Sequence, residues 1–438
     1  MSCAGHPFLK TPNLDRLAAE GVRFANAFCT TSLCSPSRAS LLSGLYAHAH
    51  GVLNNFTDYP NDLPSWPRRL REAGYETAYI GKWHMGEQQD QPRPGFDYWM
   101  SHKGQGNYFD NEFNINGRRE VIKGYYTHVV TDYAAAWLKR PRGEKPFVLC
   151  LGHKAPHGGP IQPEPKYEHV FDAVEIRKPP TADDYDRGKP AWLKESVPTW
   201  HGINGPLYGQ KDYGRFVRSY LGTILSLDDS VGRLYETLRE IGQLDNTLLI
   251  YMTDNGFVLG EHGRVDKRTL YEESIRVPLL VRCPRRVPGG KVIPQMVLNI
   301  DLAPSILDLC GVQPMERVHG RSWRPLIEGR PQGWRTSWHY VYNYESEFPY
   351  TPNVRGVRTE DWKYIHYPHG DGGPDRYKAE LYHVQEDPLE QNNLIDDPAA
   401  AGKLKELQTE LQRLMSETGA LPDKMPMDGG IRNVLPRF

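Results

Sequence analysis

Amphipathic helical segments alternate with short apolar segments along most of this chain, and the alternation limits the folds that are open to it. Helical periodicity occurs at 13–21, 65–73, 132–139 and 216–241. Apolar runs of strand length occur at 76–80, 146–151, 247–252 and 278–282. Strands that intervening helices cover on both faces are typical of parallel sheets. The sequence therefore predicts an α/β fold with a large, mainly parallel sheet flanked by helices.

The pattern changes after about residue 334. Short β-rich runs follow one another at 336–342, 356–358, 362–367 and 380–383, and a single helix is predicted at 398–418. We therefore expect two parts, a catalytic domain at 1–333 and a small C-terminal α+β subdomain, an antiparallel sheet plus a helix, at 334–438.

Composition excludes several classes of function. The formal net charge is -1 over 438 residues, so nothing indicates a nucleic-acid-binding surface. Apolar stretches are short and interrupted, so no membrane span is expected. The six cysteines have no paired short spacing, which indicates neither a zinc site nor a disulfide framework.

One cysteine stands in an unusual context, the run CSPSRASLLSG at 34–44. A lone cysteine is most simply a small buried apolar residue. Here, however, proline and arginine follow Cys34 closely, and proline is well tolerated where a helix begins. Cys34 would then lie at a helix N-terminus, where backbone N–H groups favour an anion, and Arg38 would add a cation one turn later. The run is compatible with packing or with a nucleophile beside an oxyanion site.

Other polar residues follow the predicted strands, where open α/β sheets bind ligands. Lys82 and His84 alternate in an extended segment and can face one side together, which suits an anion and proton transfer. Asp254 and Asn255 offer oxygen ligands for a hard cation, although Asp-Asn-Gly is also an ordinary turn. His157 follows another strand, and taken alone it is more often structural than catalytic.

Two of these segments resemble known signatures. The run at 34–44 resembles the first motif of the type I sulfatases, with Ser43 in place of the commoner Thr, and GYETAYIGKWH at 74–84 resembles their second motif. The likeness extends from TPNLD at 11–15 to ELY at 380–382. The chain is thus similar to the type I sulfatases of the alkaline phosphatase superfamily, and the resemblance implies an alkaline-phosphatase-like fold.

The resemblance also implies a cofactor set. In that family a formylglycine-generating enzyme oxidises the motif cysteine, so Cys34 would become formylglycine, whose hydrated aldehyde is the nucleophile. Position 34, Asp254 and Asn255 would be metal ligands, for Ca²⁺ rather than Mg²⁺ or Mn²⁺. Lys267 matches the lysine that contacts the substrate sulfate.

The same resemblance implies a reaction. Arg38 and Lys82 would hold the hydrated formylglycine while the metal and Lys267 neutralise the sulfate oxygens. One hydroxyl of the diol would attack sulfur as the leaving alcohol takes a proton from His157. His84 would then deprotonate the second hydroxyl, expelling inorganic sulfate and restoring the aldehyde.

The substrate class is open to two enzymatic interpretations. KAPHG at 154–158 and GYYT at 124–127 look similar to glycan exosulfatases, particularly N-acetylglucosamine-6-sulfatases, which implies a sulfated carbohydrate substrate. The alternative is a phosphonate or phosphate monoester hydrolase of the same superfamily.

The start of the sequence departs from the family pattern. Type I sulfatases usually begin with an apolar strand that ends in Asp-Asp and supplies two metal ligands, whereas this sequence opens with MSCAGH. We therefore expect a catalytic domain that lacks its first strand and binds calcium weakly, and a non-catalytic relic is a third interpretation. An export signal upstream would make the protein periplasmic or secreted. The sequence itself leaves compartment and oligomeric state open.

Overall fold

The computed structural model describes residues 1–158, 160–206, 212–368 and 377–436. The α-helices are α1 (Pro12–Glu20), α2 (Cys34–Ser43), α3 (Ala47–His50), α4 (Trp66–Glu72), α5 (Tyr126–Leu138), α6 (Ala191–Ser196), α7 (Tyr213–Glu240), α8 (Glu272–Ile275), α9 (Leu302–Cys310), α10 (Arg324–Ile327) and α11 (Ala401–Glu417). The strands of the large domain are β1 (Val22–Phe28), β2 (Glu76–Gly81), β3 (Tyr98–Ser101), β4 (Phe109–Ile115), β5 (Arg118–Tyr125), β6 (Phe147–Gly152), β7 (Leu249–Met252), β8 (Val258–Leu259), β9 (Val265–Asp266), β10 (Leu279–Arg282) and β11 (Lys291–Leu298).

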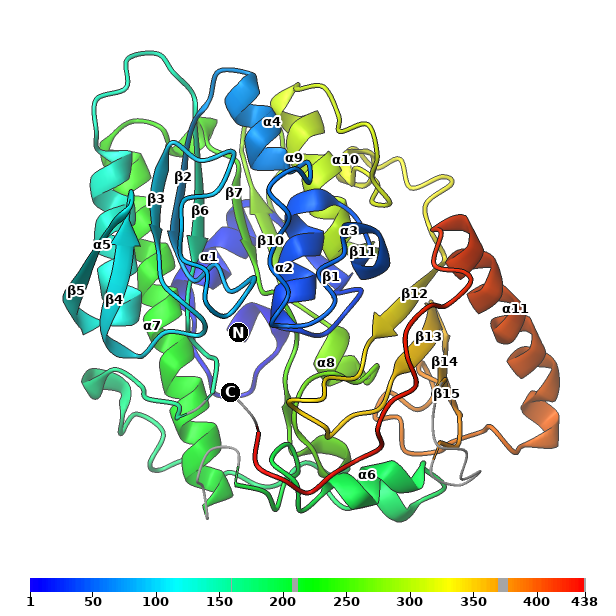
Figure 1. Ribbon diagram of the computed structural model, residues 1–438. Helices are drawn as coiled ribbons and strands as arrows, with labels where there is room; N and C mark the ends of the chain where they lie inside the picture. The colour runs from blue at the N-terminus through cyan, green and yellow to red at the C-terminus, as the bar shows by residue number, and fades with distance from the viewer. Residues whose placement is uncertain (159, 207–211, 369–376, 437–438) are drawn as a thin grey trace.

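Two sheets form the centre of the large domain and lie between helices (Figure 1). One has the order β5-β4-β3-β2-β6, and the other has the order β11-β1-β10-β7. Strand β2 is parallel to β3 and β6, and β1 is parallel to β11. The α/β class with flanking helices is confirmed. In detail the sheets are mixed, because β10 runs antiparallel to β1 and β7 and because β4 and β5 form a hairpin.

Helices cover both faces of the sheets. On one face, α5 and α7 bury Val130, Trp137 and Leu238 against β2 and β3. On the other face, α2, α4 and α9 pack against β2 and β6, with Leu70 and Leu307 in the same cluster. The predicted helix at 132–139 begins earlier, at Tyr126, because Tyr126 and Val129 extend its apolar face.

An edge strand of each sheet lines the same cavity. Strand β6 is the last strand of the first sheet and β7 is the last strand of the second. Among the described residues, β6 pairs only with β2, and β7 pairs only with β10. A cavity of about 1310 Å³ is lined by both strands and extends to the residues that follow them. The centre of the domain is therefore hollow rather than one continuous sheet.

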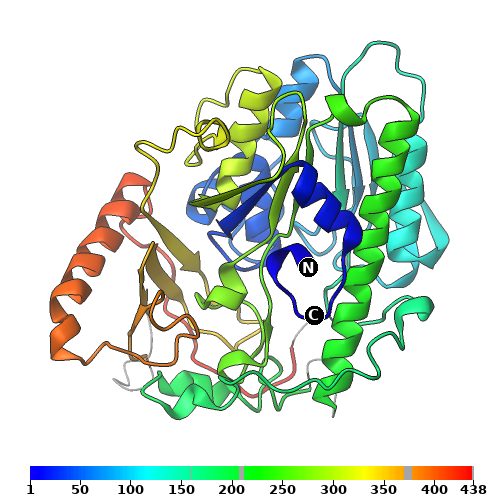
Figure 2. The ribbon, with the colours of Figure 1, turned by 180° about the vertical axis from the view of Figure 1, so that it is seen from behind.

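The C-terminal part is an antiparallel sheet of β12 (Ser337–Tyr342), β13 (Val354–Thr359), β14 (Trp362–His366) and β15 (Glu380–His383), in that order. Helix α11 covers one face of it through Leu407, Leu411 and Met415, as Figures 1 and 2 show from opposite sides. The expected antiparallel sheet with one helix is confirmed. Strand β12 also bonds to the large domain, where Val341 N donates to the Thr30 carbonyl (3.1 Å).

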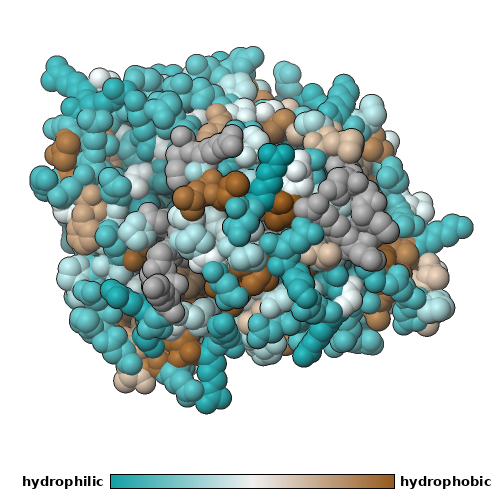
Figure 3. All heavy atoms as spheres, turned by 60° about the horizontal axis from the view of Figure 1, so that its bottom comes forward, coloured by the Kyte–Doolittle hydropathy of each residue, from teal (hydrophilic) through white to brown (hydrophobic). Residues whose placement is uncertain are grey.

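The face at the bottom of Figure 1 is largely hydrophilic. In Figure 3, which brings the bottom of Figure 1 forward, teal residues predominate and hydrophobic residues form small separate groups. Among the described helices, none combines the length and the apolar character that crossing a bilayer requires.

Candidate active site

Cys34 is the first residue of α2 and is buried, with 1% of its surface exposed. The helix begins there because Leu33 is extended and its carbonyl accepts the first helical bond, from Ser37 N (3.0 Å). The Ser35 N–H is taken by the side chain of Asn55 (3.1 Å). The Lys82 ammonium lies 3.9 Å from the Cys34 sulfur. The cysteine is thus held at a helix N-terminus beside a cation, as the sequence predicts.

Arg38 forms hydrogen bonds to residues that follow strands of both sheets. Its Nε donates to Asp254 Oδ2 (2.8 Å), and its Nη1 donates to the carbonyl of Lys82 (2.6 Å). Asp254 follows β7 and Lys82 follows β2, so the carboxyl ends of strands from both sheets meet at one guanidinium. Burial would lower the pKa of Arg38, but the neighbouring Asp254 carboxylate raises it above its usual range.

Asp254 and Asn255 present oxygen atoms to the same place. Burial favours the neutral form of Asp254, but Arg38, Lys82 and Lys267 outweigh it and lower its pKa to about 2. Asn255 donates its amide to the carbonyl of Gly256 (2.7 Å). Its buried Oδ1 has no hydrogen-bond partner within the part of the chain that the structure describes. A carboxylate beside an orphaned carbonyl-type oxygen suits a hard cation.

Three buried lysines surround the cysteine end of the cavity: Lys82, Lys154 and Lys267. Burial lowers the pKa of Lys82 to about 8, and burial together with Lys82 lowers that of Lys154 to about 7. Lys154 lies 5.1 Å from the centre of the Tyr108 ring. The sequence prediction left Lys154 out because it matches the family pattern less securely than His157; its signal was its place as the first residue of KAPHG at 154–158.

The loop that carries Lys267 is fixed from the C-terminal part of the chain. Arg268 donates Nε to Glu345 (2.7 Å) and Nη1 to Asp266 (2.7 Å), and all three side chains are buried. The Arg268 N–H also donates to the carbonyl of Ser32 (3.1 Å), close to Cys34. Glu345 therefore positions the loop through Arg268.

Two histidines stand at the site in different settings. His84 Nε2 lies 2.8 Å from Glu87 Oε1, and burial lowers the pKa of His84 to about 4. Its buried Nδ1 has no partner among the described residues. His157 Nδ1 lies 3.0 Å from the carbonyl of Gly158, and burial together with three lysines holds its pKa well below the usual range. The lowered pKa values favour the neutral imidazoles, and the ring nitrogens that Glu87 and Gly158 do not engage are Nδ1 of His84 and Nε2 of His157.

The structure brings the predicted site residues together. The cavity is lined by every one of them except His84, which lies beside Lys82: Cys34, Arg38, Lys82, His157, Asp254, Asn255 and Lys267. Gln105 was not predicted; it lies 3.1 Å from His84 Nε2, and nothing in its sequence context distinguishes it. Among the described residues, the lining brings Arg38, Lys82, Lys154 and Lys267 together around Cys34, with the carboxylate of Asp254 paired to Arg38. Such a site can bind an anionic group and move protons around it.

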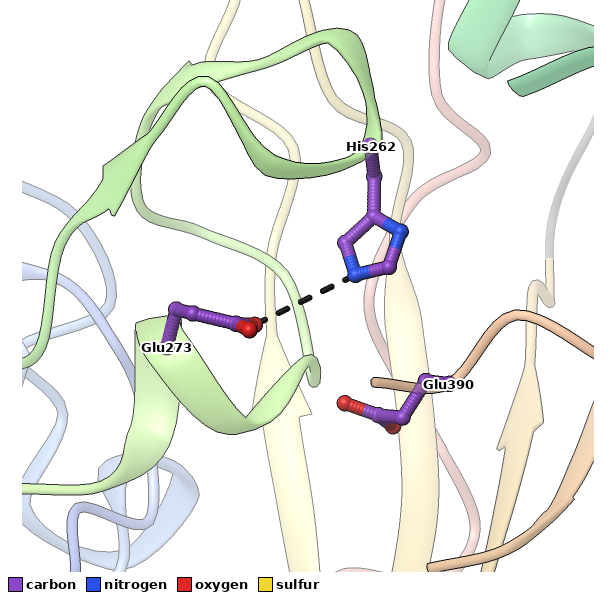
Figure 4. A group of neighbouring side chains, drawn as sticks. All are labelled: His262, Glu273 and Glu390. Atoms are coloured by element: carbon purple, nitrogen blue, oxygen red, sulfur yellow. Dashed lines mark ion pairs between the residues drawn. The ribbon is translucent and has the colours of Figure 1, made fainter. Parts of the chain in front are cut away.

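A second polar cluster, His262, Glu273 and Glu390, has ligand atoms within 4.8 Å of one another (Figure 4). His262 Nε2 lies 3.9 Å from Glu273 Oε2. The Lys363 ammonium is 2.6 Å from Glu390 Oε1, so a cation of the chain already neutralises this carboxylate. We interpret the cluster as a buried ion-pair network that joins α8 to the C-terminal sheet.

Glu273 makes the stability of this network depend on pH. Burial, with Glu261 and Glu390 nearby, raises its pKa to about 8, against 4.5 ordinarily. Between these values the folded state holds a proton that the unfolded state has released, so stability falls as pH rises. Glu273→Gln should remove this pH dependence. In urea unfolding from pH 5 to 8, the free energy of unfolding of the variant should therefore rise relative to that of the parent protein. The exposed Glu386→Gln is the control, and parallel pH profiles for Glu273→Gln and the parent would contradict the assignment.

Comparisons with known proteins agree with this geometry. The sulfatase family model matches residues 1–312, and the model of the N-sulphoglucosamine sulphohydrolase C-terminal region matches 260–417. The chain is similar to an N-acetylglucosamine-6-O-sulfatase of Bacteroides thetaiotaomicron, with 34% identity over 95% of this chain and 83% of that protein. It is also 32% identical to an extracellular sulfatase SULF-1 homolog of Drosophila melanogaster, over 73% of this chain and 29% of that protein.

A solved structure is similar over nearly the whole fold. It is BT4656 in complex with its substrate D-glucosamine-2-N,6-O-disulfate, with a TM-score of 0.87 and 32% identity, and the match covers 97% of this chain and 96% of that one. The family model covers more than half of the chain, and the two sulfatase motifs meet in one cavity. This chain belongs to the sulfatase family, within the alkaline phosphatase superfamily.

Proposed function

We propose that this protein is a sulfuric ester hydrolase that releases inorganic sulfate from 6-O-sulfated glucosamine residues. The observation that carries the proposal is the position of Cys34 at the start of α2, in one cavity with Arg38, Lys82 and Lys267. The substrate is supported by the relative named an N-acetylglucosamine-6-O-sulfatase and by the similar structure whose substrate is D-glucosamine-2-N,6-O-disulfate.

The cationic lining suits a sulfate ester. Lys82, Lys154 and Lys267 are buried, so their attraction for an anion is screened less than it would be in water. The Asp254 carboxylate and Asn255 Oδ1, with position 34, would hold a divalent cation, for which we propose Ca²⁺. When bound, such an ion would add positive charge where negative charge develops on the sulfate oxygens.

Position 34 is proposed to act as formylglycine, made from Cys34 by a formylglycine-generating enzyme. Hydrated formylglycine supplies a geminal diol, in which one hydroxyl can attack sulfur and the other can later drive elimination of sulfate. The helix N-terminus and the Lys82 ammonium, 3.9 Å from the sulfur, would stabilise an oxyanion at this position.

The two histidines are suited to separate proton transfers. With Nε2 donating to Glu87, His84 keeps the Nδ1 lone pair that a general base needs. His157 can serve as an acid only when protonated, and a bound sulfate ester would favour that form by opposing the neighbouring lysine charges.

Substitution of the histidines should therefore separate two steps. His84→Ala is expected to slow elimination and let a covalent sulfated enzyme accumulate, visible by intact-protein mass spectrometry. His157→Ala is expected to slow ester cleavage by about 10²–10⁴-fold, most severely for sugar sulfates, whose alcohols are poor leaving groups. If His157→Ala affects aryl and sugar sulfates equally, the acid assignment is wrong.

The proposed function is tested by a sulfate-release screen. The substrates are 2-, 3-, 4- and 6-O-sulfated and N-sulfated glucosamines, with aryl sulfate, aryl phosphate and aryl phosphonate in parallel. Preferential release from the 6-O-sulfated sugar is expected. Faster turnover of the phosphonate or phosphate would support the monoester hydrolase alternative, and no turnover of any ester by metal-loaded, formylglycine-containing protein would support a binding relic.

A location outside the cytoplasm is proposed as well. It is supported by the extracellular sulfatase relative and by the sugar sulfates that the proposed reaction consumes. Cell fractionation with an antibody against the protein would test it, and recovery in the cytoplasmic fraction alone would contradict it.

A further inference from the structure

The ring nitrogen Nε2 of His84 lies between two polar side chains from different loops. Glu87 Oε1 is 2.8 Å from it, and the side-chain amide of Gln105 is 3.1 Å from it. Glu87 follows β2, whereas Gln105 belongs to the loop between β3 and β4. The His84 side chain is fully buried, so bulk water does not replace either contact. The two neighbours therefore decide whether this nitrogen carries a hydrogen.

The chemistry of the two neighbours allows one arrangement. A carboxylate only accepts hydrogen bonds, so Glu87 requires a hydrogen on His84 Nε2. That nitrogen then cannot accept from the N–H groups of Gln105, and a half-turn of the amide brings the carbonyl oxygen to it instead. The half-turn also gives a donor to Gln105 Oε1, which is otherwise buried without a partner among the described residues. Glu87 dominates, because a charge-assisted bond is roughly twice as strong as a neutral one.

The backbone of His84 is fixed independently of its ring. Its φ of 45° lies in the left-handed region, which residues other than glycine rarely adopt and which persists only where the surroundings hold it. Here the carbonyl of His84 accepts a hydrogen bond from Ser35 Oγ (2.6 Å). Because Ser35 follows Cys34, the ring is anchored beside the start of α2, and Glu87 is left to set which ring nitrogen carries the hydrogen.

Glu87 is in turn held by the loop between β3 and β4. A Cβ atom on Gly104, whose φ is +53°, would lie only 2.5 Å from Glu87 Oε2, so the carboxylate packs directly against that backbone. The same loop contacts the segment of the other proposed proton-transfer residue, since Tyr108 donates its hydroxyl to the carbonyl of His157 (2.8 Å). One loop therefore braces the surroundings of both histidines.

We propose that Glu87 is a positioning residue for His84: with Gln105 as a second acceptor, its carboxylate keeps the ring hydrogen on Nε2 and leaves Nδ1 as the atom that accepts a proton. When Nδ1 is protonated, the carboxylate at 2.8 Å also stabilises the imidazolium beside the Lys82 ammonium. Burial lowers the pKa of His84, the contact with Glu87 raises it, and Lys82 lowers it further. The use of Nδ1 in sulfate elimination rests on the proposed function, whereas the tautomer does not.

The tautomer is tested without any substrate. In protein labelled with ring-¹⁵N histidine, long-range ¹H–¹⁵N correlation spectra distinguish a hydrogen on Nε2 from one on Nδ1. The signals of His84 are identified by their loss in His84→Ala. We expect the Nε2–H form in the parent protein and a mixture of the two forms in Glu87→Ala, with the other histidine signals unchanged.

Kinetics separate positioning from binding. Glu87→Ala should lower kcat for sulfate release by roughly 10²-fold and change KM by less than about twofold, and the sulfated enzyme should accumulate as in His84→Ala. The matched control is Asp172→Ala, which removes the acidic partner of His169 at the same sequence spacing (2.9 Å) in an exposed pair. This control should keep both kcat and the His84 tautomer of the parent protein.

A second variant repairs the loss from the other loop. Glu87→Ala combined with Gln105→Glu places a carboxylate on the side chain that already lies 3.1 Å from His84 Nε2. We expect it to restore the Nε2–H form and to recover roughly tenfold of the lost kcat. A carboxylate on Gln105's loop would not repair Glu87→Ala if Glu87 only supported the local fold.

Three outcomes would overturn the proposal: an Nδ1–H form in the parent protein, an unchanged tautomer in Glu87→Ala, or no recovery of the tautomer in the double variant. The expected tautomer shifts in a protein that releases no sulfate from any ester would support the positioning role and count against the proposed function. Normal sulfate release with an unchanged tautomer in Glu87→Ala would do the reverse.

Discussion

Replacing Cys34 with alanine is expected to abolish sulfate release while leaving the protein folded. Among the hydrogen bonds of the described residues, the Cys34 side chain has one contact, the Lys82 ammonium at 3.9 Å, and alanine is well tolerated at the first position of a helix. Loss of a covalent nucleophile removes the chemistry itself, so we expect a decrease of about 10⁴-fold or more in kcat/KM. The assay is sulfate release by formylglycine-containing protein, with the modification measured by peptide mass spectrometry.

Cys29→Ala is the matched control for this experiment. Cys29 directly follows β1 and is as deeply buried as Cys34. It is not among the residues that line the cavity. We expect Cys29→Ala to keep its activity and to lose some stability. Turnover by Cys34→Ala above a few per cent of the parent rate, or a Cys34 peptide that remains a thiol after co-expression with the maturation enzyme, would contradict the assignment.

Asp254→Ala is expected to damage both stability and activity. The substitution leaves the largely buried Arg38 guanidinium without the carboxylate that neutralises it. Breaking a fully buried pair costs about 3–5 kcal/mol, and we expect a loss near the lower end because the two side chains are 15% and 18% exposed. It also removes the proposed anionic metal ligand, so calcium content and sulfate release should fall together. Urea unfolding and atomic emission on the same preparations measure the two effects.

A double variant separates charge burial from catalysis. Arg38→Met combined with Asp254→Ala removes both charges, so we expect it to recover most of the stability lost by Asp254→Ala and none of the activity. Glu72→Ala serves as the surface control, because its pair with Arg69 is exposed and should contribute less than about 1 kcal/mol. A double variant no more stable than Asp254→Ala would show that Arg38 is not the source of the destabilisation.

Much of the site was predictable because its residues follow strands. Cys34 begins a helix, and Lys82, Asp254 and His157 lie one, two and five residues after the ends of β2, β7 and β6; open sheets gather such positions at one edge. Lys154 was weighed and left out, because the features that set it apart are its burial and the lack of an acidic partner among the described contacts. Those properties arise only when Gln105 and Tyr108 pack over it.

The bounds of helices and strands were predictable where the apolar periodicity is strong, but the direction and pairing of the strands were not. The helices α1 and α7 and the strands β2 and β6 lie close to their expected bounds, because their apolar spacing is regular. The direction of β10 could not be predicted, since an apolar run has the same pattern whether it pairs parallel or antiparallel. The hairpin of β4 and β5 was missed, because β5 is mostly exposed and charged.

The ion pair between Arg268 and Glu345 bears on when, during translation, the active-site loop can adopt its folded position. Arg268 is synthesised before Glu345. Until Glu345 has left the ribosome, the Arg268 guanidinium, which is buried in the folded protein, has only Asp266 of its two carboxylate partners. The loop at 266–268 can settle only after Glu345 and β12 have emerged. A nascent chain that ends at residue 333 therefore contains every proposed catalytic side chain but lacks Glu345, one of the two carboxylates that fix the loop carrying Lys267.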